Sequence, residues 1–246
     1  MKPRRTYTRL GRISQHFDEP KVMHTASART TTGYDLIIFD CDGVLVDSEA
    51  LACKCLAELL QRHGIDVALE AVFERFLGQS ISAVASHFQA LGRAMPDEFP
   101  AELHVLVRKS FVDSLHAMAD VERVLRSLDI AYCVASSSDL ERVNFSLELT
   151  GLSALFAGRV FTAQMVQSGK PAPDLFLYAA ASMAAEPART LVIEDSISGV
   201  QAGKAAGMTV WGFVGGSHYA SRNGRALLAA AGADQVFDRM ADLRFN

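Results

Sequence analysis

Cysteine is scarce in this chain and follows no metal-binding pattern. The four cysteines, Cys41, Cys53, Cys55 and Cys133, include no Cys-x-x-Cys pair, and the seven histidines form no His-Glu-x-x-His motif. These absences exclude the common zinc motifs. We expect four free thiols in a reducing compartment.

The chain also lacks a long apolar run and an excess of positive charge. No segment approaches the roughly 20 apolar residues that a membrane-spanning helix needs. The net charge is −4, which gives no sign of a nucleic-acid partner. Half of the 246 residues are hydrophobic, enough for the core of one large domain or two small ones. We therefore expect a cytoplasmic protein, monomeric or homodimeric, without nucleic-acid or membrane partners.

Residues 1–33 differ in composition from the rest. They carry seven Lys or Arg against two acidic residues, with many Ser and Thr. This composition overlaps with that of organelle transit peptides, but no clear amphipathic period or secretory apolar segment is present. We favour a flexible basic N-terminal extension.

Short apolar runs rich in Val, Ile and aromatic residues alternate with helical patterns. Such runs are typical of strands that are covered on both faces, and the alternation predicts a doubly wound parallel sheet, a Rossmann-like α/β core. The predicted strands are 34–40, 130–136, 190–195, 208–214 and, as a weaker edge candidate, 234–238; the helical patterns between the later ones are 139–151, 173–185 and 196–207.

The stretch 48–118 interrupts this alternation. It contains no convincing strand and keeps a helical period throughout, beginning with a helix for which Ser48 is a plausible N-cap and Gly64 the C-terminal stop. The pattern predicts an all-helical cap domain at 48–118, inserted into a core made of 34–47 and 119–246.

Polar residues stand at the ends of three predicted strands. Asp40 and Asp42 follow the first, Ser136 to Ser138 end the second, and Glu194 and Asp195 end the third; Lys170 lies in a loop ahead of a helix. Ligands of open parallel sheets bind beyond the carboxyl ends of the strands, so these groups are expected to converge.

Clustered carboxylates repel one another and need a cation. Oxygen donors suit Mg²⁺, which commonly retains waters and a substrate phosphate. A Lys and a hydroxyl beside it could neutralise a phosphoryl group. One carboxylate could then attack phosphorus to form an aspartyl-phosphate, and a second could act as general acid and base.

Four segments in order resemble the signature motifs of the haloacid dehalogenase superfamily. They are "DCDGVLVDSE", "VASSS", "GKPAPDLF" and "VIEDSISGV". The resemblance covers about 34–240 and is to the branch with a helical cap after the first motif, near the sugar phosphatases and β-phosphoglucomutases.

The resemblance implies a role for each matching residue. Asp40 looks like the nucleophile and a Mg²⁺ ligand, and Asp42 like the general acid and base whose backbone carbonyl also reaches the metal. Lys170 looks like the cation that stabilises Asp40 and the phosphoryl oxygens. The remaining matches are Ser136 and Ser137 for phosphate binding, Glu194 and Asp195 for the metal, and Gln79 and Ser80, in a turn between cap helices, for substrate choice.

Other members of the superfamily help to choose the reaction. Its dehalogenases generally lack a carboxylate at the position of Asp42, so phosphoryl transfer is favoured. The mutases carry an Arg, a His and an Asn where this chain has Ile81, Ala52 and Leu140. We therefore expect a Mg²⁺-dependent phosphatase of a small phosphorylated metabolite, a sugar or sugar-acid monophosphate. A phosphosugar mutase and a non-catalytic binding protein are the alternatives.

Several nearby polar residues also have structural explanations. Asp47 and Glu49 are expected to shape the loop and the first turn of a helix, where acids favour the dipole. Ser138 could contact substrate or cap a helix, and Asp174 is expected at a helix start. His218, after the fourth predicted strand, is a weak candidate for a substrate contact.

Overall fold

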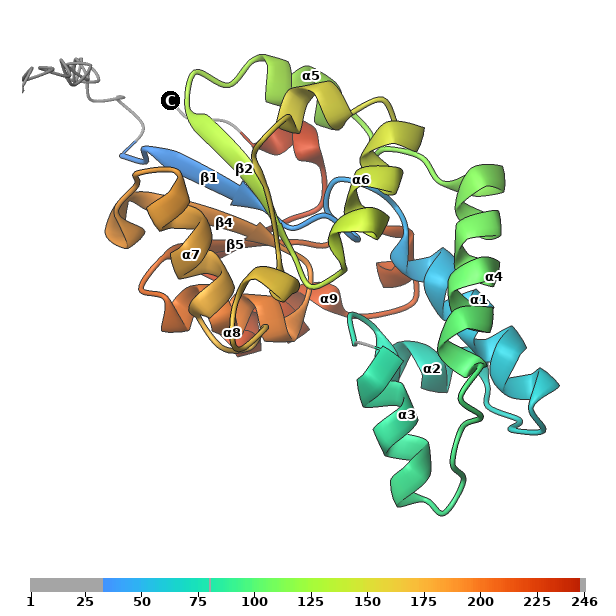
Figure 1. Ribbon diagram of the computed structural model, residues 1–246. Coiled ribbons are helices and arrows are strands. Elements are labelled where there is room, and N and C mark those ends of the chain that lie inside the picture. The colour runs from blue at the N-terminus through green and yellow to red at the C-terminus, as the bar shows by residue number, and fades with distance from the viewer. Residues whose placement is uncertain (1–32, 80, 244–246) are drawn as a thin grey trace, which may run out of the picture.

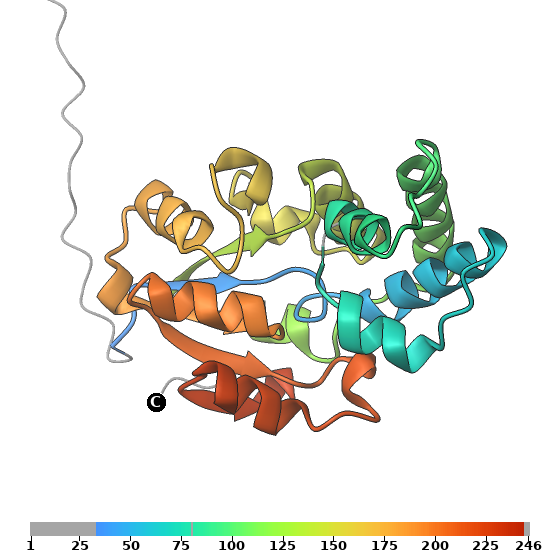
Figure 2. The same ribbon diagram turned by 90° about the horizontal axis from the view of Figure 1, so that it is seen from below.

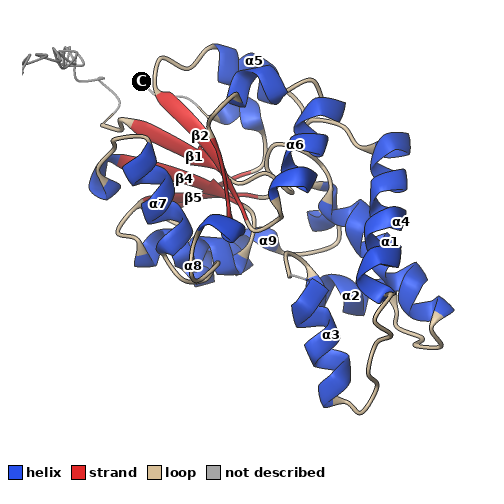
Figure 3. Cartoon of the chain, viewed as in Figure 1, coloured by secondary structure: helices blue, strands red, loops and turns tan. Residues whose placement is uncertain are grey.

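The computed structural model describes residues 33–79 and 81–243. Within these residues the core is a sheet of six parallel strands in the order β3-β2-β1-β4-β5-β6 (Figures 1 and 3). The strands are β1 (Leu36–Phe39), β2 (Ala131–Ser136), β3 (Val160–Thr162), β4 (Thr190–Glu194), β5 (Thr209–Phe213) and β6 (Gln235–Phe237).

The five predicted strands are confirmed, and no end differs from the prediction by more than two residues. β3 was not predicted, because it is a three-residue edge strand that pairs with β2 alone. So short a segment shows no readable alternation. The strand order reverses direction next to β1, which is the topological switch point where such sheets bind ligands.

Helices cover both faces of the sheet, as Figure 2 shows from below. Ile37 and Phe39 of β1 pack on the face covered by α5 (Val121–Arg126) and α6 (Leu140–Leu149). Leu36 and Ile38 pack on the opposite face, against α7 (Asp174–Ser182) and α8 (Ile197–Ala205), and α9 (Gly224–Ala231) joins that layer. β1 is thus buried on both sides, which explains its uninterrupted apolar run.

The segment between β1 and β2 is helical, as predicted. Helices α1 (Glu49–Arg62), α2 (Leu69–Phe76), α3 (Ile81–Ala90) and α4 (Phe99–Ser114) pack around an apolar cluster of their own. Gly64 follows α1 with φ +75° and donates its N–H to the carbonyl of Gln61, which confirms it as the C-terminal stop. Ser48 occupies the N-cap position of α1, as predicted, but its hydroxyl forms no capping bond and donates to Asp42 instead.

The two chain segments that join this helical region to the core lie side by side. Val46 pairs with Ala117, the N–H of Asp47 donates to the carbonyl of His116, and the N–H of Met118 donates to the carbonyl of Leu45. Because the two connecting segments pair at Val46, α1 begins directly after the loop that follows β1. Among the described residues, no helix is long and apolar enough to cross a membrane.

Candidate active site

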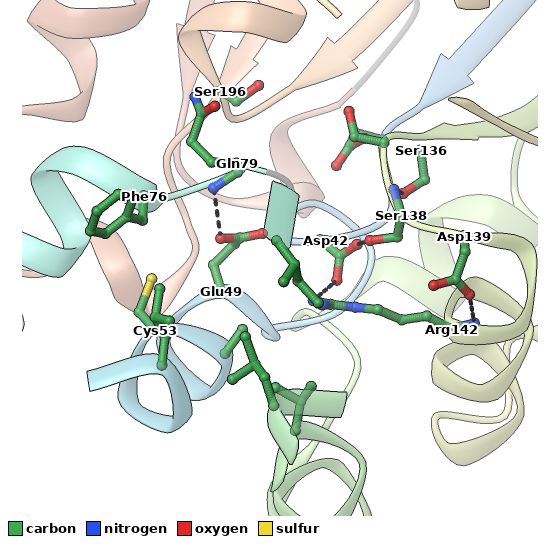
Figure 4. Close-up of a pocket in the computed structure, with 18 of the residues that line it drawn as sticks. Asp42, Glu49, Cys53, Phe76, Gln79, Ser136, Ser138, Asp139, Arg142 and Ser196 are labelled. Atoms are coloured by element: carbon green, nitrogen blue, oxygen red, sulfur yellow. Dashed lines mark hydrogen bonds and ion pairs between the residues drawn. The ribbon is translucent and has the colours of Figure 1, made fainter. Parts of the chain in front are cut away.

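The carboxyl ends of β1, β2 and β4 open into a cavity of about 390 Å³. The core wall carries Asp40, Asp42, Ser136, Lys170 and Asp195, and α1 to α4 form the facing wall. Figure 4 shows Asp42 and Ser136 on one side of the cavity and Glu49 and Phe76 on the other. The predicted convergence of polar groups from separate strand ends is therefore confirmed.

Lys170 links two of these strand ends. Its ammonium donates to Asp40 Oδ1 at 2.5 Å, to Glu194 Oε1 at 2.7 Å and to the carbonyl oxygen of Ala135 at 3.0 Å. Its side chain is 2% exposed. Burial alone lowers the pKa of Lys170, but the two carboxylates outweigh this effect and raise the pKa above its ordinary value, so the group is a fixed cation.

Asp40 and Asp195 carry negative charge that the protein only partly offsets. Burial raises the pKa of Asp40 well above its usual range, against the lowering effect of Lys170, and the neighbouring Glu194 adds to the rise. Burial and the charge of Glu194 likewise raise the pKa of Asp195. This shortage of positive charge is an electrostatic environment in which a cation would be stabilised.

Asp42 is held differently, by three donors. Ser48 Oγ donates to Oδ1 at 2.7 Å, Arg142 Nη2 donates to the same oxygen at 3.0 Å, and Ser138 Oγ donates to Oδ2 at 2.7 Å. Burial raises the pKa of Asp42, but the charge of Arg142 and these hydrogen bonds lower it below its ordinary value. The pKa of Asp42 is thus shifted in the direction opposite to that of Asp40.

Arg142 is a residue that the sequence analysis missed. It lies on α6, one turn beyond Ser138, and its guanidinium also lies 5.2 Å from the ring of Phe111 on α4. An Arg at this point of a helix gives no sequence signal, because the helical period alone does not show that it faces the sheet edge. Ser138 does not cap α6, because Asp139 accepts the N–H of Arg142 and takes that role. Ser138 lines the cavity, as a substrate contact would require, and donates its hydroxyl to Asp42.

The expectation that Glu49 only serves the first turn of a helix is wrong. Its side chain lines the cavity, is 8% exposed, and accepts a hydrogen bond from Gly78 N at 3.2 Å. Burial, with the charges of Asp42 and Asp195, raises the pKa of Glu49 to about 7. Figure 4 shows this carboxyl between α1 and the turn after α2.

The other predicted binding residues are placed as follows. Ser136 is 1% exposed, lines the cavity, and accepts a hydrogen bond from Ser138 N at 3.1 Å. Ser137 and Gln79 line the cavity and are exposed. Ser80 lies outside the described residues.

Asp47 contacts the loop after β5, and His218 lies in that loop. Neither residue lines the cavity. Asp47 accepts hydrogen bonds from the N–H and hydroxyl of Ser217, which agrees with the expected structural role of Asp47. His218 is 2% exposed, and its Nε2 lies 3.2 Å from Asp195 Oδ2, so the suggested substrate contact is wrong. Burial lowers the pKa of His218.

The donor chemistry suits Mg²⁺, although the carboxylates do not form a ready-made cage. In the described part of the chain, no group of three or more His, Cys, Asp or Glu side chains is close enough to hold a metal ion. Asp42 is turned toward its three donors, and Glu194 bonds Lys170 and both the N–H and hydroxyl of Ser196. Asp40 and Asp195 therefore remain the better carboxylate ligands, with water and a backbone carbonyl to complete the shell.

Gly199 leaves room for Glu194. A Cβ at this position would lie 1.7 Å from Glu194 Oε1, so Gly199→Ala is expected to lower the free energy of unfolding by about 1–3 kcal/mol. A loss of stability would identify the clash with Glu194, because replacing a helical Gly with Ala otherwise stabilises a protein by up to about 1 kcal/mol. Urea unfolding measures the change.

Gly169→Ala is a control for the added methyl alone, because Gly169 lies in a loop outside any helix. Its added methyl would meet Ala163 Cβ at an ordinary 3.5 Å. A Gly199→Ala protein as stable as the wild type would show that Glu194 does not need this space.

The chain is a doubly wound α/β protein with a ligand site at the switch point of its sheet, where acidic side chains and Lys170 gather below a helical insert. The family model for haloacid dehalogenase-like hydrolases matches residues 34–207. The chain belongs to this family.

Two curated relatives of the chain are phosphatases. It is 28% identical to 6-phosphogluconate phosphatase of Escherichia coli (strain K12) over 190 residues, 75% of this chain and 84% of that protein. It is 31% identical to fructose-1-phosphate phosphatase of the same organism over 179 residues, 71% of this chain and 94% of that protein.

A solved structure is also similar. The crystal structure of a family hydrolase from Deinococcus radiodurans R1, with bound phosphate and sodium, has 31% sequence identity and a TM-score of 0.71, and the match covers 87% of this chain and 94% of that one. The fold and the enzyme family are therefore shown.

Proposed function

We propose that the chain is a Mg²⁺-dependent phosphatase that hydrolyses a small phosphorylated metabolite through an aspartyl-phosphate. The observation that carries this proposal is the buried Lys170, which joins Asp40 and Glu194 at the end of the cavity. A fixed cation against a carboxylate at the floor of a cavity suits nucleophilic attack on a phosphoryl group.

In this mechanism a carboxylate oxygen of Asp40 forms a bond to phosphorus while the bond from phosphorus to the ester oxygen breaks, and the substrate's carbon chain leaves as an alcohol. Lys170, with the hydroxyls of Ser136 and Ser137, binds the phosphoryl oxygens and stabilises the charge that develops on them. Bound Mg²⁺, held by Asp40, Asp195 and the carbonyl of Asp42 with Glu194 supporting the site, would supply further neutralisation of that charge.

Asp42 protonates the leaving oxygen and then takes a proton from the water that hydrolyses the aspartyl-phosphate. Its three donors favour the ionised form, which suits the second step. Donation of a proton in the first step requires that at least one of these contacts is released, because each one stabilises the carboxylate rather than the acid.

The substrate class follows from the cavity and from the relatives. A volume of about 390 Å³ suits a small metabolite. The two curated relatives are named for 6-phosphogluconate and fructose 1-phosphate, which supports a sugar or sugar-acid monophosphate here. Gln79 and Ser80 are proposed to contact the part of the substrate beyond the phosphate.

The mutase alternative is weakened by two positions in the cavity wall. Ala52 and Ile81 line the cavity, where the mutases carry His and Arg, and neither can hold a phosphosugar by a hydrogen bond. Leu140, at the place of the mutase Asn, does not line the cavity. The intact set of acids and Lys170 argues against a non-catalytic protein.

We also keep the proposed division into a core of 34–47 and 119–246 and a cap of 48–118, supported by the paired connection of Val46 and Ala117. A cytoplasmic location is supported by four buried free cysteines. A monomer or homodimer that binds no nucleic acid remains our expectation.

The test is release of inorganic phosphate from a panel of phosphorylated sugars, sugar acids and polyols with Mg²⁺. We expect turnover of at least one sugar or sugar-acid monophosphate, and loss of activity with excess EDTA that returns when Mg²⁺ is added. Interconversion of phosphosugars without phosphate release would establish the mutase. Undiminished rates in EDTA would contradict the metal requirement, and inactivity on the whole panel would contradict the proposed function.

A further inference from the structure

Glu49 is the buried acidic group on the cap side of the cavity. Among the described cap residues that line the cavity, the other charged or strongly polar side chains are exposed; they are Gln79, His104 and Arg108. Glu49 is 8% exposed and lies in the first turn of α1. The rest of this wall is largely apolar, with Leu56, Phe76 and Phe111 among its members.

The hydrogen-bonding capacity of Glu49 is largely unused by the protein. From the described residues its carboxyl accepts one hydrogen bond, which comes from Gly78 N at 3.2 Å and engages Oε2. An ionised carboxylate has about four acceptor sites. A buried carboxyl with so few partners costs free energy unless a ligand or water completes its shell.

The reaction assigned above does not use Glu49. The phosphoryl group is accounted for by Asp40, Lys170 and Ser136, at the floor of the cavity. Glu49 belongs to the opposite wall, and Figure 4 shows it apart from Ser136 and directed into the space between the cap and the core. It is therefore placed to meet the carbon chain that carries the phosphate.

We propose that Glu49 determines specificity by binding a hydroxyl group of the substrate's carbon chain, so that the enzyme selects phosphorylated sugars and polyols over alkyl phosphates. The inference rests on the proposed phosphatase function and deepens it. The partner is a hydroxyl rather than an anion, because Asp42 and Asp195 already make this part of the cavity negative.

The protonation state of Glu49 also favours a hydroxyl group as its partner. With a pKa of about 7, Glu49 is present near neutral pH in both forms, and each can hydrogen-bond a group that donates and accepts. A site built to bind a hydroxyl discriminates strongly against the analogue that lacks it, because its polar group is then left without a partner.

The experiment compares kcat/KM for matched pairs of compounds. Each hydroxylated substrate (6-phosphogluconate, fructose 1-phosphate and glycerol 3-phosphate) is paired with the n-alkyl phosphate of the same carbon number. Glu49→Ala is expected to lower kcat/KM about 10- to 100-fold for the hydroxylated member that the wild type prefers, and to leave the alkyl phosphate within about twofold. The alkyl phosphate rate also reports how much of the variant is folded and active.

Two further variants separate recognition from structure. Glu49→Gln keeps an oxygen for Gly78 N–H but loses the carboxylate, so we expect a smaller loss confined to the hydroxylated member. Glu58→Gln is the matched control: Glu58 lies on the same helix, is exposed, and pairs with Arg62. It should leave both rates unchanged.

Each other outcome has a defined meaning. An equal loss on both members of a pair in Glu49→Ala would show that the residue only positions the turn at Gly78 and would overturn the inference. A wild-type enzyme that does not discriminate within any pair would do the same. A wild type that releases phosphate from none of the five compounds, and from no other member of the panel, would contradict the proposed function, and the inference with it.

Discussion

Asp40→Asn is expected to abolish turnover, with kcat reduced by at least about 10⁴-fold. The amide is close in shape to the carboxylate but is not a nucleophile, so no aspartyl-phosphate can form. The measurement is phosphate release with the best substrate of the panel, together with mass spectrometry of acid-quenched enzyme to detect the covalent intermediate. Both signals should disappear in the variant.

Asp129→Asn provides the comparison for this variant. Asp129 is exposed and precedes β2, at the end of the sheet opposite the cavity, so activity should stay within twofold of the wild type. Substantial phosphatase activity in Asp40→Asn would mean that another group attacks phosphorus, and the assigned mechanism would be wrong.

Lys170→Met is expected to lose both activity and stability. It leaves the buried carboxylates of Asp40 and Glu194 without the cation that joins them, at a cost of about 3–5 kcal/mol in the free energy of unfolding. Loss of the group that offsets phosphoryl charge should lower kcat about 10²- to 10³-fold. Urea unfolding without metal and steady-state kinetics with Mg²⁺ measure the two effects.

The stability loss should depend on pH in a definite direction. Burial already raises the pKa of Asp40 in the folded protein, and removal of Lys170 would raise it further. A group whose folded pKa lies above its unfolded value favours folding at low pH and loses that contribution as pH rises through the folded pKa. The deficit of Lys170→Met relative to the wild type should therefore be larger at pH 8 than at pH 5.

Two comparisons make the Lys170 result interpretable. Adding Glu194→Gln to Lys170→Met should recover part of the stability but none of the activity, because it removes one unpaired charge without restoring the cation. Lys204→Met removes a Lys whose side chain is 38% exposed and pairs with Asp234, and it should change stability by no more than about 1 kcal/mol. A Lys170→Met protein as stable as Lys204→Met would contradict the bridging role.

The layered fold was predictable because each principal strand is a separate apolar run between helical patterns. β1 shows this well: its residues Leu36 to Phe39 face both helical layers and are apolar without exception. β3 escaped prediction because its three residues form an edge strand whose pairing with β2 comes from the tertiary structure. The helical insert was readable because its apolar period is helical from α1 to α4.

The site residues that could be predicted from the sequence are those at the ends of strands. Asp40, Ser136 and Glu194 follow or end strands that lie next to one another, so their convergence is a consequence of the parallel sheet. Glu49 could not be placed in the same way. It looked like an ordinary acid in the first turn of a helix, and its burial depends on how α1 packs beside the turn at Gly78.

The sequence by itself therefore determined the class of fold, the helical insert and the set of acids and Lys at one edge of the sheet, since these depend on local patterns and on the geometry common to all parallel sheets. Only the tertiary structure decided which charges pair. Lys170 reaches Asp40 and Glu194, Arg142 reaches Asp42 from α6, and Glu49 enters the cavity from the cap. Such pairings depend on distances between segments far apart in the chain and on the side-chain rotamers that packing allows, and neither is encoded in a local pattern.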